Sequence, residues 1–222
     1  MWFCALLLTS PALLVAQLNF KVGYTASFFN LEANDGILER FNAARPYLDD
    51  VWDPVGFING VDLGLAFQSD LIGLEAGYEL KFGQRSAEGI PPGATESFQD
   101  RVFYNLQGFY VGGKVGYEIL FAGVNLMQNR LQMSFLNDDL DDRLTILRDN
   151  YQSLQFYLSL EPNPDDPFRF SIRPFVEIPV GNVNLREAAE FLEPDFAADA
   201  PADFYEERWV QYGIRIVFLN GR

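Results

Sequence analysis

The sequence predicts an all-β fold, an eight-stranded antiparallel up-and-down barrel that crosses a membrane, and three observations lead to it. Long segments alternate between apolar and polar side chains, the period-two signature of a strand with two unlike faces. Eight such segments follow one another, and the connections between them are alternately short and long. Apolar residues make up 49% and aromatic residues 15% of the 222-residue chain, which is too many for a solvated, unfolded tail.

The alternation is clearest at the two ends of the chain. From Leu18 to Phe28 every second side chain is apolar, and the residues between them are polar or small. The segment of residues 210–218 has the same pattern. The predicted strands cover residues 18–28, 61–68, 72–82, 102–117, 120–133, 154–160, 168–178 and 210–218.

The turns between these strands follow from residue type. Ser69 and Asp70 predict a tight turn, and the proline-rich stretch 161–167 predicts another. The middle segment is ambiguous, because a turn at Glu118 and Ile119 and a turn at Gly112 and Gly113 both fit. The long connections are expected at residues 30–56, 84–101, 134–150 and 181–207.

Alternation alone does not say which face points outward. A soluble ligand-binding barrel or sandwich would turn its apolar face inward. Three features favour the membrane orientation: small and charged residues on the polar face, which suit a narrow lumen; aromatic residues near strand ends; and strands about as long as the roughly 9 to 11 residues needed to cross the hydrocarbon core.

The first 16 residues and the amino-acid inventory limit the function. Residues 1–16 carry the only Cys, Cys4, and no charge, and they are expected to be a secretory signal peptide that leaves residues 17–222 as one barrel domain. The chain has no His, so His-dependent triads, dyads and metal sites are excluded. With 16 Lys and Arg against 31 Asp and Glu, nucleic acid is not an expected partner.

These features together resemble one protein family. The signal segment, the eight alternating segments, the rhythm of short and long connections and the closing strand from Trp209 to Phe218 look like the small outer-membrane β-barrels of Gram-negative bacteria, of the OmpA and OmpX kind. The resemblance implies an outer-membrane location and partners in the membrane lipid and the outer-membrane insertion machinery. In the family an aromatic residue ends the chain, whereas four residues follow Phe218 here.

With the apolar face outward, the lumen receives charged residues of both signs. Buried charges are costly unless they are paired, so we expect ion pairs across the barrel, such as Glu75 or Glu79 with Arg173 or Arg215. This network is either a structural core or a gate, and acid–base catalysis by Glu75 and Glu79 is a weaker alternative. The nine expected members are Lys21, Asp62, Glu75, Glu79, Lys81, Arg169, Arg173, Glu177 and Arg215.

The long connections hold most of the acidic excess. They are either a solvated, self-repelling surface or a specific Ca²⁺ or Mg²⁺ site, and residues 137–142 do not match an EF-hand loop. Short helices are expected around Ile37 to Phe41, on the face shared by Leu140, Leu144 and Leu147, and over residues 188–192 after an Asn184 cap. The aromatic loop residues either contact a partner or attach the loops to the barrel rim; the contact candidates are Trp52, Phe191, Phe204 and Tyr205.

The sequence therefore predicts a monomeric, non-enzymatic outer-membrane barrel without a cofactor or metal, acting through its outer loops. Its expected roles are envelope integrity, adhesion or docking of an extracellular protein or glycan. The alternative is a narrow transport channel for small solutes or apolar molecules. A lipid-modifying enzyme is a third hypothesis, disfavoured because the barrels it would resemble use His.

Overall fold

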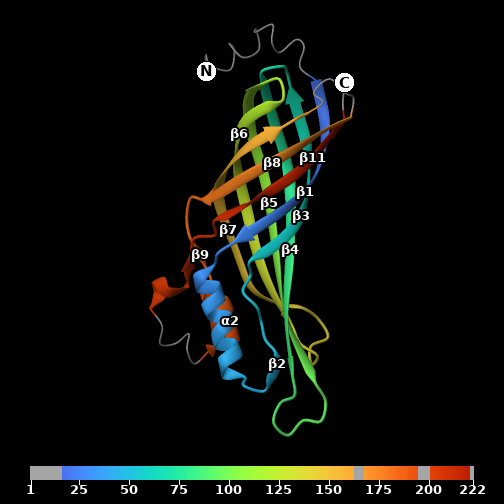
Figure 1. The fold of residues 1–222 in the computed structure, drawn as a ribbon. Helices are drawn as coiled ribbons and strands as arrows, with labels where there is room; N and C mark the ends of the chain where they lie inside the picture. Colours follow the sequence, from blue (N-terminus) through green and yellow to red (C-terminus); the bar gives the residue numbers. More distant parts are fainter. Residues whose placement is uncertain (1–16, 163–167, 195–200, 221–222) are drawn as a thin grey trace.

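The computed structural model describes residues 17–162, 168–194 and 201–220, so the expected signal segment 1–16 lies outside the described residues. Eight antiparallel strands form a ring that the pairing of β4 with β5 closes (Figure 1). The predicted up-and-down barrel is confirmed. The strands are β1 (Gln17–Phe29), β3 (Phe57–Gln68), β4 (Ile72–Gly89), β5 (Phe98–Tyr117), β6 (Leu120–Leu136), β7 (Leu144–Leu160), β8 (Phe168–Pro179) and β11 (Gln211–Asn220).

The apolar face points outward. Phe20 is 68% exposed, whereas its neighbour Lys21 is 1% exposed and points into the ring. Leu63, Leu74 and Ile214 on three other strands are exposed in the same way. Soluble proteins rarely expose a continuous apolar surface of this extent, so a soluble barrel is excluded and the face forms a belt for lipid. The molecule is therefore a membrane-spanning β-barrel with its short turns at one end and its long connections at the other.

Strands β4 to β7 continue beyond this belt. They have 17 to 20 residues each, whereas the other four barrel strands have 10 to 13. On β5, residues from Phe109 to Tyr117 expose apolar side chains, but beyond them Val102, Tyr104 and Leu106 are buried on the inner face. The apolar face therefore changes sides where the strands leave the membrane.

This change of side corrects two predicted boundaries. The connections after β4 and β6 cover only residues 90–97 and 137–143, not 84–101 and 134–150, because the strand pairing continues above the belt. The turn at Glu118 and Ile119 is the one that forms, with Glu118 at a φ of 52°. Gly112 and Gly113 lie inside β5 instead.

Two helices occupy the space beside the extended strands (Figure 1). Helix α2 (Glu32–Ala44) confirms the helix expected around Ile37 to Phe41, and α3 (Arg186–Leu192) confirms the one after Asn184, whose side-chain oxygen accepts the N–H of Arg186 at 2.9 Å. No helix among the described residues is long and apolar enough to span a membrane. The small elements are β2 (Leu48–Asp50), β9 (Val183–Asn184), the 3₁₀ turn η2 (Ala202–Tyr205) and β10 (Glu206–Glu207).

The helix expected from Leu140, Leu144 and Leu147 is wrong. β7 begins at Leu144, and its register against β6 shifts between Met133 and Ser134. This bulge lets the adjacent residues Ile146 and Leu147 both bury their side chains. Leu140 lies before β7 and Leu144 is exposed, whereas Leu147 is buried, so the three leucines do not form one face.

Candidate functional site

The interior of the barrel holds all nine charged residues that the sequence singled out. Each is buried, although each belongs to a type that is almost never buried without a partner. They come from β1, β3, β4, β8 and β11, so the closure of the ring brings them together.

One cluster lies around Glu75. The Glu75 Oε2 atom is 3.0 Å from Lys21 Nζ and 2.7 Å from Arg173 Nη1. Lys21 Nζ also lies 3.5 Å from Asp62 Oδ2. The hydroxyl of Tyr110 donates to Asp62 Oδ1 at 2.8 Å. Side chains from five strands, β1, β3, β4, β5 and β8, thus meet around two carboxylates.

A second cluster lies closer to the long connections and is joined to the first by Arg215. The Arg215 guanidinium reaches Glu79 Oε1 at 2.7 Å and Asp62 Oδ2 at 3.0 Å. Lys81 Nζ is 3.1 Å from Glu79 Oε2 and 3.4 Å from Glu177 Oε2. The pairs of Glu75 with Arg173 and of Glu79 with Arg215 are among the cross-barrel contacts that the sequence suggested.

Neutral side chains complete the coordination of Glu177. Its Oε1 atom accepts hydrogen bonds from Ser153 at 2.6 Å and from Asn129 at 2.8 Å. Lys81, which is paired with Glu79 and Glu177, also donates a hydrogen bond to the side-chain oxygen of Gln211 at 2.7 Å. Ion pairing alone does not offset the desolvation free energy of a buried charge, and these hydrogen bonds reduce the part that remains.

Arg169 lies apart from these clusters, near the turn end of the barrel. Its guanidinium donates to the side-chain oxygen of Asn19 at 2.6 Å. Two residues that the sequence reasoning missed also lie toward this end: Lys114 is paired with Glu161, which also accepts a hydrogen bond from Gln68 at 3.0 Å. Alternation could have identified both residues: Lys114 lies on the inward face of β5, and Glu161 continues the inward series of Ser153, Gln155 and Ser159 just past the end of β7.

Beyond the clusters lies a second structure, here called the cap: α2, β2, α3, η2, and the parts of β4 to β7 above the belt. Its apolar core joins the inner face of the extended strands to the two helices. Trp52 stacks on Phe41 with ring centroids 3.7 Å apart, and its Nε1 donates to the carbonyl of Asp100 at 3.2 Å. The apolar core of the cap therefore fastens the first long connection to β5.

A carboxylate distant in sequence holds the first turn of α2. Glu207 Oε2 accepts the backbone N–H of Ala33 at 2.7 Å and that of Asn34 at 3.4 Å. The residue before the helix, Leu31, offers no capping side chain. Burial raises the pKa of Glu207 above its usual range, and the two backbone N–H groups oppose that rise. The last long connection thus caps the helix of the first.

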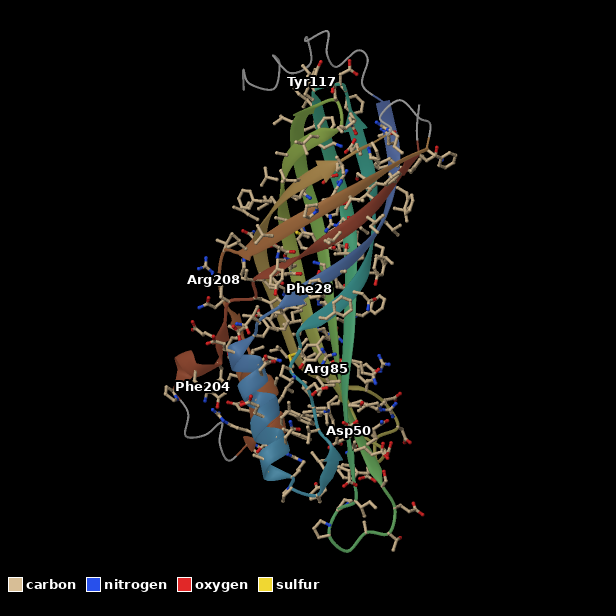
Figure 2. The ribbon with its side chains drawn as sticks, viewed as in Figure 1. Phe28, Asp50, Arg85, Tyr117, Phe204 and Arg208 are labelled. Atoms are coloured by element: carbon tan, nitrogen blue, oxygen red, sulfur yellow. The ribbon has the colours of Figure 1, made fainter. Side chains whose placement is uncertain are left out.

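The four expected loop contacts divide into two groups. Trp52 and Tyr205 are 2% and 1% exposed, so they offer no contact surface, and the alternative that these rings attach the cap to the barrel applies to them. Phe191 is exposed and meets Phe135 edge to face. Phe204 is half-buried under the guanidinium of Arg40 and lies at the outer edge of the cap (Figure 2).

The cap contains a cavity of about 730 Å³, here called the cap cleft. It is open to solvent and lies between the end of α2, the tip of α3 and the ends of the β4–β5 and β6–β7 hairpins. Its volume is within the range of small-ligand sites. The lining residues are Phe41, Arg45, Tyr47, Pro91, Ala94, Glu96, Ser97, Phe98, Asp100, Phe135, Asn137, Asp138, Asp139, Phe191 and Leu192.

Asp100 is the most unusual of these residues. It is 4% exposed, and burial raises the pKa of its carboxyl to about 6, although Arg45 favours the charged form. Among the described residues, no hydrogen bond or ion pair reaches its carboxylate. Nor do the described residues contain a group of three or more acidic or Cys side chains arranged to hold a metal ion.

No protein-family model matches the chain. Among curated proteins, none is similar enough to be matched. Solved structures with a similar fold include the attachment invasion locus protein Ail of Yersinia pestis, at 10% identity over 93% of this chain and 97% of that one, with a TM-score of 0.44. Neisserial surface protein A is 8% identical over 92% and 96%, with a TM-score of 0.40. The outer membrane protease OmpT of Escherichia coli is 10% identical over 93% and 94%, with a TM-score of 0.34.

Proposed function

We propose that this protein is a non-enzymatic outer-membrane barrel whose lumen does not conduct and whose cap docks an extracellular partner. The observation that carries the proposal is the pairing inside the barrel. Arg173 and Arg215, two of the longest side chains, cross the lumen to carboxylates on β4. An eight-stranded barrel leaves room for little more than its own side chains.

The cap supports the same conclusion at the outer end. Its buried apolar core stands in line with the lumen, so an ion leaving the charged clusters would meet Leu106, Leu131 and Met133 instead of water. Hydration of an ion is lost in such surroundings at a large cost in free energy. The charged clusters in the lumen and the apolar core of the cap together favour a sealed barrel that anchors the cap outside the cell.

The lumen carboxylates are also poorly suited to catalysis. Glu75 and Glu79 are each held by two cationic groups at 3.1 Å or less. A general acid at neutral pH needs a carboxyl that holds its proton, which nearby positive charges oppose. We therefore assign Glu75 and Glu79 to a structural network rather than to a gate or an active site.

Conductance measurement tests the sealed lumen. The purified chain, refolded and inserted into a planar bilayer, is expected to give no unitary current steps at 100 mV in 1 M KCl, under conditions in which a general porin conducts. Insertion is checked by heat-modifiable migration of the same sample. Reproducible current steps from the wild-type chain would contradict the proposal and favour the alternative, a narrow channel for small solutes.

A further inference from the structure

We propose that the cap cleft binds a guanidinium group, presented as an arginine side chain by the extracellular protein that the cap docks. This inference rests on the proposed docking role and names the chemistry that the site recognises. It is carried by three features of the cleft: its excess of negative charge, one buried carboxylate without a partner, and walls of aromatic rings.

The charge of the cleft favours a cation. Glu96, Asp100, Asp138 and Asp139 line it, and Arg45 is the only Lys or Arg among its described lining residues. That guanidinium is already paired with Glu193, with 2.6 Å between Arg45 Nη1 and Glu193 Oε1. A ligand with a positive charge would therefore be attracted into the cleft.

Asp100 supplies the anchoring atom. Asp138 is engaged already, because it accepts the backbone N–H of Gln99 at 2.8 Å and lies 3.8 Å from Arg101. Asp100 is buried and lines the cleft, yet within the described residues its carboxylate has neither a hydrogen bond nor an ion pair. Buried carboxylates are stable when they are paired, so this one is left ready for a donor that enters from the cleft.

The aromatic walls distinguish a guanidinium from other cations. Tyr47 and Phe98 lie with ring centroids 5.9 Å apart, and Phe41, Phe135 and Phe191 line the same cavity. A guanidinium is flat and weakly hydrated, so it stacks on such rings, whereas an ammonium is compact and strongly hydrated.

The chain itself shows this mode of binding at the edge of the cleft. The guanidinium carbon of Arg45 lies 3.6 Å from the centroid of the Phe41 ring while its Nη1 atom contacts Glu193. One aromatic face and one carboxylate thus already hold a guanidinium here. Asp100 and the neighbouring rings provide the same two elements without an occupant from the described chain.

The test uses the full chain folded in detergent and a short probe, the peptide acetyl-Gly-Arg-Gly-amide. Its matched control replaces arginine by citrulline, which keeps the shape but carries no charge. Titration calorimetry at pH 7.5 is expected to give a saturable signal for the arginine peptide and none for the citrulline peptide. A lysine peptide is expected to bind more weakly than the arginine peptide. Equal binding of the arginine and citrulline peptides, or no binding of either, would overturn the proposal.

Two variants with the same change of charge locate the site. Asp100→Asn is expected to weaken binding of the arginine peptide about tenfold or more, because one charge-assisted contact is lost. Asp70→Asn changes an exposed residue in the turn after β3, at the opposite end of the barrel, and is expected to leave binding unchanged. Equal loss in both variants would show attraction by net charge only and would refute a site at the cleft.

The pH dependence gives an independent readout. Lowering the pH from 7.5 to 5 protonates Asp100, whose pKa is raised to about 6, so the affinity for the arginine peptide is expected to fall with a midpoint near 6. Asp100→Asn should lose this midpoint. If the arginine peptide does not bind, this inference fails, but the proposal of a non-conducting lumen is unaffected. If the barrel conducts and still binds the arginine peptide, the proposed function fails and this inference stands.

Discussion

Arg215 offers the sharpest test of the buried network. Its guanidinium contacts Glu79 and Asp62 at 2.7 and 3.0 Å, and its Nε donates to the hydroxyl of Thr25 at 3.2 Å. Replacing it by methionine keeps much of the side-chain volume and removes the charge and all five donors. Lys81 remains beside Glu79 at 3.1 Å and Lys21 beside Asp62 at 3.5 Å, so each carboxylate would keep one cation instead of two.

The expected cost follows from the burial of both partners. Arg215 and Glu79 are each only 2% exposed at the side chain, so water cannot replace the lost contact. A pair of unit charges about 4 Å apart interacts by about 4 kcal/mol at an effective dielectric constant near 20, and breaking a buried pair from one side costs about 3–5 kcal/mol. Arg215→Met should therefore lower the free energy of unfolding by about 3–5 kcal/mol.

Urea unfolding in detergent, followed by the fluorescence of Trp52 and Trp209, measures this change. Arg208→Met is the matched control: Arg208 is exposed on the outside of the protein (Figure 2), and its loss should change stability by less than about 0.5 kcal/mol. The double variant Glu79→Gln with Arg215→Met should lose about 1–3 kcal/mol less than the two single losses together. Strictly additive losses, or a loss in Arg215→Met no larger than the control, would refute the energetic role of this pair.

Two further changes test the barrel wall and the cap. Gly112→Ala places a Cβ against Asn125 and the carbonyl of Val124, so it should lower the free energy of unfolding by about 1–3 kcal/mol. The control Gly56→Ala, whose Cβ would have no atom within 4 Å, should leave that free energy nearly unchanged. Urea unfolding compares the two variants, and equal losses would contradict the close packing at Gly112. Glu207→Gln weakens the hydrogen bonds to the first turn of α2 and should destabilise that helix by about 1 kcal/mol, which is measured as faster hydrogen exchange of its backbone amides. Unchanged exchange would show that the charge of the carboxylate does not stabilise the helix.

Inward and outward positions in the membrane-spanning part could be predicted from alternation. Lys21 and Arg215 sit between exposed apolar neighbours, and that pattern alone placed them in the lumen. Their partners could not be derived from the pattern in the same way. Arg215 and Glu79 are 136 residues apart, and only the register of closed strands decides which charges meet.

The extension of β4 to β7 into the cap escaped prediction for a different reason. Above the belt, Arg101 and Gln107 face outward while Leu106 is buried, so the period of two persists but its polarity is reversed. Since water replaces lipid there, the apolar side must turn inward to pack on α2 and α3. A rule that expects the apolar side chains to stay on the outer face along the whole strand therefore ends the strand too early. This is what happened at the outer ends of the β4–β5 and β6–β7 hairpins.

By itself, the amino-acid sequence determined a barrel of eight strands, an apolar belt and a charged interior, because each of these depends on residues that follow one another at a fixed spacing. Tertiary structure alone decided which of the inward charges pair with each other, the capping of α2 by Glu207 and the lack of a partner for the Asp100 carboxylate in the cap cleft. Those features join residues from distant segments, and their energies depend on burial. Burial exists only after the ring has closed and the helices have packed against the extended strands.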